Sequence, residues 1–450
     1  MKRPVCKLLE TGVALPGRLA WAALLAGALV AGCEGLEGRP EGRDPVGEIT
    51  QPGSSLPGGD YLFCVTNLGH TLRAFDPAAG TWGYARYLEP DPVGPWLYGT
   101  PPTGYYISRV DGGGGGRNAL IRFNPRTGVE SGRLYFPANS NPNELLILPG
   151  SSPLTGWVAL RGSSFDNFAT NGLAVVNLET LAQTAFFDLN ALAPLAGITQ
   201  TSLLGFVHDP ACNAGAGCVY GLVNNWSMSD GYRPGRLLAL AAGAAGEPAL
   251  LDSETLGVNP VLPLLLDEGT GELWVANNGG YSSLCPDADS CAGQPGSLQA
   301  LDTGRLDNGV PEDAAVIRLG GPGSCAAGAG PCVEYDDFPQ DPAGLGRLNA
   351  GTAWVFTWPD DMVRELDIDP ASAGYRELKP PEPLLPRVTG PLFKGPLAGG
   401  TGATAGIYAG MGGFGNALAG RLDPVGGTLL ETFDLEAGQG PVSCTGHTLP

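Results

Sequence analysis

The feature that most constrains the fold is a series of short apolar runs separated by turn-forming residues. It is clearest between Asn259 and Gly320. The runs there are Val261–Leu266, Leu273–Ala276, Leu298–Leu301 and Ala315–Leu319, with Gly, Asp, Asn and Pro between them. This spacing is typical of four strands in an antiparallel meander. One such sheet cannot bury both of its faces, so the pattern predicts neighbouring sheets of the same kind.

Similar units recur along the chain. They span residues 61–89, 104–137, 143–190, 202–254, 259–320, 353–379 and 405–435. Repetition of one sheet unit predicts an all-β β-propeller, with seven four-stranded blades closed by the C-terminal strand. Six and eight blades are the alternatives, because the first strands of the second, sixth and seventh units are poorly marked.

One pattern repeats within the units: an apolar strand ending in Asn, then a strand ending in Asp-Pro. Val65-Thr66-Asn67, followed by HTLRAFDPAAGT, resembles the YVTN family of β-propeller repeats of surface-layer and other exported bacterial proteins. Looser copies end at Asn224 and Asn277. Asn can bond its own backbone in the turn, and Asp-Pro with a nearby Gly reverses the chain. The resemblance implies a fold, which does not carry a function.

The first unit offers three strands, whereas the chain continues beyond the seventh unit. A ring of blades must join its ends, so we expect Val442–Leu449 to be the innermost strand of the first blade, next to 61–67. This arrangement places Cys444 beside Cys64. It predicts a Cys64–Cys444 disulfide.

The N-terminus carries an export signal. Four basic residues precede an apolar segment from Leu19 to Val30, which ends in Leu29-Val30-Ala31-Gly32-Cys33. The segment is too short to span a bilayer comfortably, and small residues mark a cleavage point. Its end resembles a bacterial lipobox, which implies palmitate-type lipidation of Cys33. Because Glu34 follows the Cys, the resemblance favours the outer membrane. An ordinary signal peptide with an incidental Cys is the alternative.

These signals predict three regions: a signal peptide (1–32), a lipidated Cys with a flexible tether (33–60) and the β-propeller (61–450). Removal of residues 1–32 leaves 21 Lys and Arg against 44 Asp and Glu, a formal charge of −23. Such a charge excludes nucleic acid as an expected partner. The expected partners are the membrane, through the lipid, and a protein or glycan ligand.

The mature chain keeps an even number of cysteines besides Cys33, which implies disulfides in an exported protein. Six form close pairs across short loops: Cys212 with Cys218, Cys285 with Cys291, and Cys325 with Cys332. Local bridges are the expected connectivity. Metal binding is the alternative, but no His lies near a Cys pair at zinc-finger spacing.

Motifs that carry chemistry are scarce. No GxSxG elbow occurs in the sequence, and the three histidines, His70, His208 and His447, lie far apart. The glycine run between Asp111 and Arg117 lacks the ending of a phosphate loop. Other weak candidates are acidic: Asp287 and Asp289 at the start of a calcium-like loop, and the pairs Asp336-Asp337 and Asp360-Asp361. We therefore assign no catalytic, cofactor or metal residue.

Two function classes remain. The first is a non-catalytic binding or scaffold lipoprotein, with a recognition surface formed by the loops near Gly112, Trp226 and Tyr281. The second is a metal-dependent, lactonase-like hydrolase on the same fold, which needs acidic, Asn and His side chains around a divalent ion in the central channel. The small number of histidines favours the binding protein.

Overall fold

The computed structural model divides the chain into two units, 1–47 and 48–450, and all residues that the structure describes belong to the second. The structure describes residues 55–66, 70–88, 91–109, 118–162, 170–194, 199–227, 231–243, 246–279, 296–303, 312–320, 332–334, 341–347, 349–358, 362–378, 396–399, 406–411, 418–422, 429–434 and 442–450. Within these residues, no helix is long and apolar enough to cross a membrane.

The described strands form sheets that follow one another in sequence. The first contains β28 (Val442–Leu449), β1 (Gly59–Thr66), β2 (Thr71–Asp76) and β3 (Thr81–Tyr87). The next contains β4 (Pro92–Tyr98), β5 (Thr103–Ser108), β6 (Ala119–Phe123) and β7 (Glu130–Tyr135). Then come β8 (Pro142–Ile147), β9 (Thr155–Leu160), β10 (Gly172–Asn177) and β11 (Ala182–Asp188), after which α2 (Leu189–Leu192) begins.

The second half continues in the same way. One sheet holds β12 (Ser202–Asp209), β13 (Cys218–Ser227), β14 (Gly231–Ala242) and β15 (Pro248–Val258), with the short helix η1 (Asn213–Gly215) between its first two strands. The next holds β16 (Pro260–Asp267), β17 (Glu272–Asn277), β18 (Ser297–Asp302), β19 (Glu312–Gly320) and β20 (Cys332–Glu334). The remaining two are β21 (Asp341–Arg347), β22 (Thr352–Trp358) and β23 (Met362–Asp367), and β24 (Pro396–Gly399), β25 (Gly406–Met411), β26 (Leu418–Leu422) and β27 (Leu429–Asp434).

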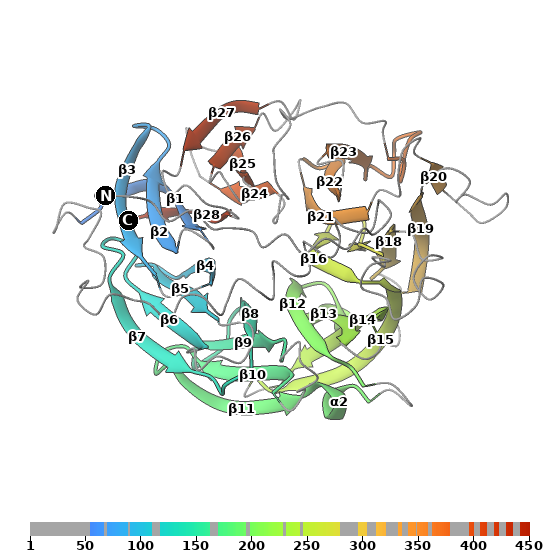
Figure 1. The fold of residues 1–450 in the computed structure, drawn as a ribbon, viewed down its shortest axis with the longest axis horizontal. Coiled ribbons are helices and arrows are strands. Elements are labelled where there is room, and N and C mark those ends of the chain that lie inside the picture. The colour runs from blue at the N-terminus through green and yellow to red at the C-terminus, as the bar shows by residue number, and fades with distance from the viewer. Residues whose placement is uncertain are drawn as a thin grey trace, which may run out of the picture. The chain divides into compact units, whose positions relative to one another are not determined.

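The sheets form a ring in which the innermost strands of neighbouring sheets contact one another. In the order β28, β4, β8, β12, β16, β21 and β24, each contacts the next, and β24 contacts β28. Figure 1 shows that the strands of each sheet lie side by side, in order from the centre of the ring outward. The predicted closure is present, because β28 pairs with β1 over its whole length, from Gly59 opposite Leu449 to Thr66 opposite Val442. The prediction of an all-β β-propeller is confirmed.

The prediction of seven four-stranded blades is wrong. Among the described residues, six sheets have four strands or more, and the sheet of β21, β22 and β23 has only three. Residues 374–378, predicted to lie in the last strand of that unit, instead contain turns and a single bridge from Leu378 to Leu366. Prolines from Pro380 onward cannot donate a ladder hydrogen bond, which is consistent with this early end. The sheet before it has five strands because β20 adds to β19 in parallel.

The core lies between adjacent sheets. One cluster joins Phe63 and Leu72 to Ile121, and another joins Trp157 and Leu173 to Phe206. Middle strands are therefore covered on both faces and consist of continuously buried residues, as in β9. The outermost strands show little alternation between buried and exposed residues and are largely exposed, as in β11.

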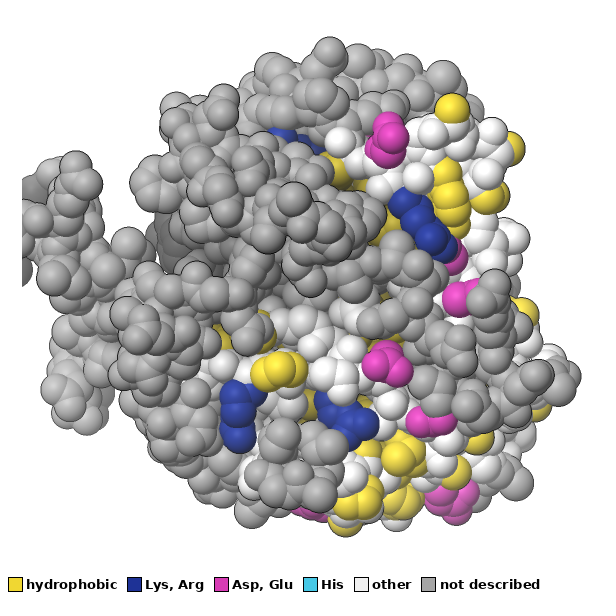
Figure 2. Space-filling model, turned by 90° about the vertical axis from the view of Figure 1, so that its right-hand side faces the viewer, with side chains coloured by type: hydrophobic (Ala, Val, Ile, Leu, Met, Phe, Trp, Pro, Cys, Tyr) yellow, Lys and Arg dark blue, Asp and Glu magenta, His cyan; other side chains and the backbone are white. Residues whose placement is uncertain are grey.

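The connections divide between two ends of the ring. The connections from second to third strand, and from one sheet to the next, lie at one end, which we call the loop face. The other connections lie at the opposite end, the turn face. On the outer side seen in Figure 2, the described acidic, basic and hydrophobic side chains are interspersed. That side shows no single chemical character in its described part.

Candidate binding face

The three loops predicted to form a recognition surface belong to the loop face. Gly112 and Tyr281 lie outside the described residues. Trp226 is described, and it lies near the end of β13, in the hairpin that β13 forms with β14. The described part of the predicted recognition surface therefore consists of this hairpin and the residues next to it.

Trp226 and Tyr232 stand opposite each other on the two strands of this hairpin. Their ring centroids are 6.2 Å apart, and both side chains are partly exposed. The pairing register shifts between Val223 and Asn225. A bulge of this kind increases local twist and re-aims the side chains beyond it. The hairpin therefore presents two aromatic rings at the loop face.

The base of the hairpin is fixed by hydrogen bonds to the residue before β12. The Thr201 hydroxyl donates to the main-chain oxygen of Asn224 at 3.1 Å and accepts from the Trp226 N–H at 2.7 Å. The Asn225 side chain accepts from the Thr201 N–H and donates to the main-chain oxygen of Pro234. Asn225 and Thr201 are both buried at 1% exposure. The two rings are thus carried on a rigid support.

Polar groups surround this aromatic pair. Burial raises the pKa of Tyr232, and the positive charge of Arg161 on the preceding sheet opposes that rise. Arg233 follows Tyr232 directly in β14. The indole Nε1–H of Trp226 is buried and donates to no residue in the described part of the chain. A buried donor without an acceptor is costly, and a bound ligand with a hydroxyl or carbonyl oxygen can satisfy it.

A string of polar contacts runs along the loop face from sheet to sheet. Arg109, just after β5, pairs with Asp91 at 2.7 Å and donates to Asn143 Oδ1 at 2.5 Å. Asn143, in β8, donates in turn to the main-chain oxygen of Leu204 in β12 at 2.5 Å. Three consecutive sheets are therefore joined near their first strands.

The Asn residues of the repeat pattern also donate hydrogen bonds to other side chains. Asn224 donates to Asn259 Oδ1 at 2.7 Å, which lies before the next sheet, and Asn277 donates to Ser297 Oγ at 3.1 Å. The expectation that these Asn residues bond their own turn is wrong, because the neighbouring strand or sheet offers a fixed acceptor. The Asp of the Asp-Pro pattern does cap its own turn, since Asp76 accepts from the N–H groups of Ala78 and Ala79.

The three histidines are not brought together. His70 Nδ1 lies 3.2 Å from the Tyr87 hydroxyl, and burial lowers the pKa of His70 while Asp91 opposes that change. His447 lies in β28 and His208 in β12. The other weak candidates, Asp111 to Arg117, Asp287, Asp289, Asp336, Asp337, Asp360 and Asp361, lie outside the described residues. No group of three or more potential metal ligands occurs among the residues that are described.

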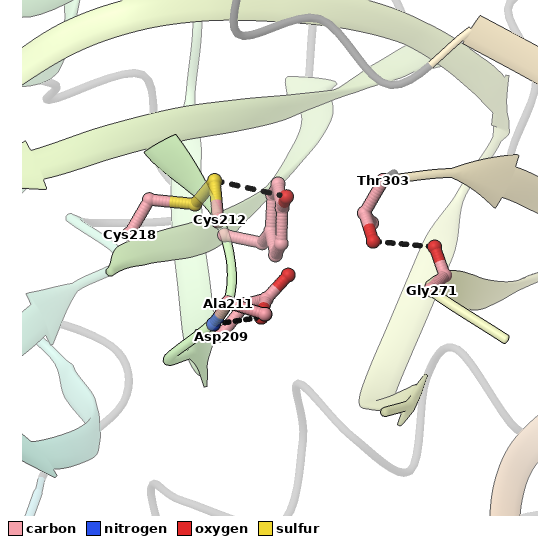
Figure 3. Close-up of a disulfide and its surroundings, with 7 residues drawn as sticks. Asp209, Ala211, Cys212, Cys218, Gly271 and Thr303 are labelled. Carbon is pink, nitrogen blue, oxygen red and sulfur yellow. Dashed lines mark hydrogen bonds between the residues drawn. A yellow bond between two sulfur atoms is a disulfide. The ribbon is translucent and has the colours of Figure 1, made fainter. Parts of the chain in front are cut away.

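The described cysteines are paired. Cys64 is bonded to Cys444, and Cys212 to Cys218 across a sequence separation of 6. Figure 3 shows the second bridge, where the Tyr220 hydroxyl donates to Cys212 Sγ at 3.4 Å and Asp209 accepts from the Ala211 N–H. Burial raises the pKa of Tyr220, and Asp209 adds to that rise. Cys33, Cys285, Cys291 and Cys325 lie outside the described residues, and only the backbone of Cys332 is described.

The partners of Trp226 were not predicted from the sequence. Tyr232 could have been found as the aromatic residue across a short connection between second and third strands. Arg161 could not, because 65 residues separate it from Trp226 and the two residues belong to different sheets. Arg109 and Asn143 carry no motif.

No family model and no curated relative matches the chain. Solved structures do. A periplasmic gluconolactonase of Pseudomonas aeruginosa, PpgL, is 14% identical with a TM-score of 0.54, over 87% of this chain and 100% of that one. A protein of Lactobacillus plantarum is 12% identical with a TM-score of 0.53, over 86% and 99%.

A third match is hydrazine synthase of Kuenenia stuttgartiensis, 11% identical with a TM-score of 0.52, over 89% of this chain and 100% of that one. The chain is a β-propeller. At these identities the likeness concerns the fold alone, so the propeller's ligand must be argued from its own residues.

Proposed function

We propose that this protein is an exported, lipid-anchored β-propeller that binds glycan at its loop face. The lipobox-like sequence ending at Cys33 supports export and anchorage. The observation that carries the binding role is the Trp226–Tyr232 pair with its buried indole N–H. Aromatic rings pack against the C–H face of a sugar ring, while an N–H group and guanidinium groups donate to its hydroxyl oxygens.

The attachment of the tether favours this arrangement. Leu56 lies three residues before β1, and its N–H donates to the main-chain oxygen of Arg126 at 2.9 Å on the turn face. Arg126 Nη1 donates back to the main-chain oxygen of Leu56 at 2.6 Å. Because Leu56 joins the propeller at the turn face, this attachment does not occupy the loop face.

A glycan array tests the proposal. The wild-type protein, Trp226→Ala and Tyr98→Ala are applied to bacterial cell-envelope polysaccharides. Tyr98 is an exposed aromatic residue at the end of β4 on the turn face, so its replacement is the matched control. We expect Trp226→Ala to bind about tenfold more weakly, equivalent to about 1.4 kcal/mol, and Tyr98→Ala to bind as the wild type does. Equal binding by Trp226→Ala, or no binding by any form, contradicts the proposal.

Metal-dependent lactone hydrolysis is the second candidate, suggested by the gluconolactonase among the similar structures. A likeness of 14% identity does not carry an activity. Hydrolysis of gluconolactone by the purified protein, abolished by a chelator and restored by a divalent ion, favours this candidate over a binding protein.

A further inference from the structure

A row of exposed aromatic side chains follows the loop face over consecutive sheets. Among the described residues, Tyr87, Tyr135 and Phe186 have exposed fractions of 51%, 49% and 38%. Each belongs to the outermost strand of its sheet: Tyr87 ends β3, Tyr135 ends β7, and Phe186 lies two residues before the end of β11. Because these strands run from the turn face to the loop face, the three rings lie at or near the loop face.

The row leads to the pair Trp226 and Tyr232. The strands β3, β7 and β11 belong to the first, second and third sheets of the ring, and the pair belongs to the fourth. Neighbouring sheets in this order contact each other through their innermost strands. Figure 1 shows β3, β7 and β11 on the outside of the ring, in an arc that leads to β14 and β15. We call the three exposed rings and the pair the aromatic arc.

Polar groups accompany the two tyrosine rings of the arc. The Tyr87 hydroxyl lies 3.2 Å from His70 Nδ1, and the centroids of these two rings are 5.8 Å apart. Arg133 Nη1 donates to the Tyr135 hydroxyl at 3.4 Å, and the guanidinium carbon lies 5.6 Å from the centroid of that ring. Both positions therefore combine an aromatic ring with hydrogen-bonding groups, as the Trp226–Tyr232 pair does.

The spacing of the rings favours a polymer chain over a protein partner. The core of a protein interface is a contiguous patch, in which aromatic anchors are surrounded by other packed residues. Here polar residues separate the rings, such as Ser131 and Arg133 in β7 and Gln183 and Thr184 in β11. A polysaccharide suits this pattern, because it packs on single rings at intervals and forms hydrogen bonds between them.

We propose that the aromatic arc binds one long polysaccharide chain, with its tightest contact at Trp226 and Tyr232. This inference rests on the proposed glycan-binding function and extends it from a single sugar site to a polymer. After the first contact, each further ring binds a segment of a chain that is already held in place. Affinity therefore rises with chain length, and a chain too short to reach the next sheet gains nothing.

Titration with chains of two lengths tests the proposal. The probe is the cell-envelope polysaccharide that binds most tightly on the glycan array, used intact and after partial acid hydrolysis to short oligosaccharides. At equal concentrations of sugar units, we expect the intact chain to bind about tenfold or more tightly than the oligosaccharides. Equal affinities overturn the arc. They leave the single site at Trp226 standing, because both probes can occupy it.

Substitutions separate the arc from the site at Trp226. We expect Tyr135→Ala and Phe186→Ala each to bind the intact chain about fivefold more weakly and the oligosaccharides as the wild type does. Trp226→Ala weakens binding of both probes, and Tyr98→Ala on the turn face is the control for loss of an exposed ring. If one arc variant does not fold, the other decides the question.

Two results contradict the arc. Wild-type binding of the intact chain by Tyr135→Ala and Phe186→Ala leaves the exposed rings to another partner, such as a protein, and overturns the proposal. Equal losses for the intact chain and the oligosaccharides indicate a general change in the propeller and also overturn it.

Discussion

Cys64 of β1 lies directly opposite Cys444 of β28, with the two Cα atoms 4.0 Å apart and a disulfide between them. The bond joins residues separated by 380 positions, so it fastens the two ends of the ring. The ladder between β1 and β28 holds the same two strands together over their whole length. At the turn face, Arg126 donates hydrogen bonds to Leu56, just before β1, and to Pro450, just after β28. Closure of the propeller therefore rests on one covalent bond supported by hydrogen bonds.

Loss of this bond lowers thermal stability more than loss of the short-loop bridge. Loop entropy gives about 6 kcal/mol for so long a span, with about 5 kcal/mol as a practical ceiling, against about 2 kcal/mol for the short loop. We expect the double variant Cys64→Ser, Cys444→Ser to have a lower melting temperature than Cys212→Ser, Cys218→Ser. Non-reducing peptide mapping checks the bond itself. Free thiols at positions 64 and 444, or equal melting temperatures, contradict the prediction.

Removal of Asn143 weakens the ring at the loop face. Asn143→Ala deprives Arg109 of one acceptor and the Leu204 oxygen of its donor. We expect unfolding free energy to fall by about 2–3 kcal/mol in urea titrations, because two partly buried polar groups lose a partner. The matched control is Asn124→Ala, an exposed turn residue that accepts from the Arg126 N–H, with an expected cost of about 1 kcal/mol or less. Equal costs mean that the string of contacts does not hold the sheets together.

Acid sensitivity is expected at the contact between the fifth and sixth sheets. Burial alone raises the pKa of Asp267, but hydrogen bonds from Arg347 and the Gly269 N–H, with the charge of Arg347, lower it overall. Asp267 lies 2.8 Å from Arg347. Because the native pKa lies below the unfolded value, the stabilisation is complete above about pH 4 and is lost as pH falls through the native pKa.

Asp267→Asn therefore flattens the dependence of unfolding free energy on pH in the acid range, and at neutral pH it costs about 1–3 kcal/mol. Glu130→Gln is the control, because its pair with Arg133 is exposed and contributes less than about 1 kcal/mol. Urea titrations between pH 3 and pH 7 give both quantities. A wild-type acid dependence that Asp267→Asn retains in full assigns the effect to other groups.

Membrane attachment depends on Cys33 if the lipobox-like sequence is used. We expect the wild-type protein to enter the detergent phase in Triton X-114 partition and Cys33→Ser to stay in the aqueous phase. Mass spectrometry of the N-terminal peptide measures the modification directly. A wild-type protein with an unmodified Cys33, recovered in the soluble fraction, contradicts the prediction.

Strand positions were predictable where both faces of a strand are covered. The predicted run Leu273–Ala276 lies within β17, because a buried middle strand needs continuous apolar residues. The first strands β4, β21 and β24 were missed. Their sequences PVGPWLY, DPAGLGR and PLAG contain Pro and Gly, which are tolerated because one edge of each strand faces the centre and pairs with no strand.

A recurring aromatic residue marks the second strand of each sheet more clearly than the turn pattern does. The third residue of the second strand is aromatic in sheet after sheet, and the most buried examples are Tyr105, Trp157, Tyr220, Trp274 and Trp354. The first four belong to clusters that join two adjacent sheets. Aligned on these residues, the units fall into register more clearly than on the Asn or Asp-Pro pattern, because packing fixes the aromatic residue while turns tolerate variation.

The candidate site was predictable only as a place on the ring. Trp226 marked a loop, but its significance depends on Tyr232, on the Thr201 support and on Arg161 from another sheet. A site assembled across the junction of two sheets depends on how those sheets pack, which a local sequence pattern does not encode.

The most direct test of the glycan-binding face is the NMR signal of the Trp226 indole N–H. Residues 33–450 contain seven Trp, and loss of a cross-peak in Trp226→Phe assigns the resonance. Trp157 provides an internal control, because its indole already donates to the main-chain oxygen of Gly246 at 2.6 Å. In a titration with a polysaccharide selected from the array, we expect the Trp226 cross-peak to move with saturation while that of Trp157 stays in place. Saturable binding that leaves the Trp226 cross-peak unmoved contradicts the account.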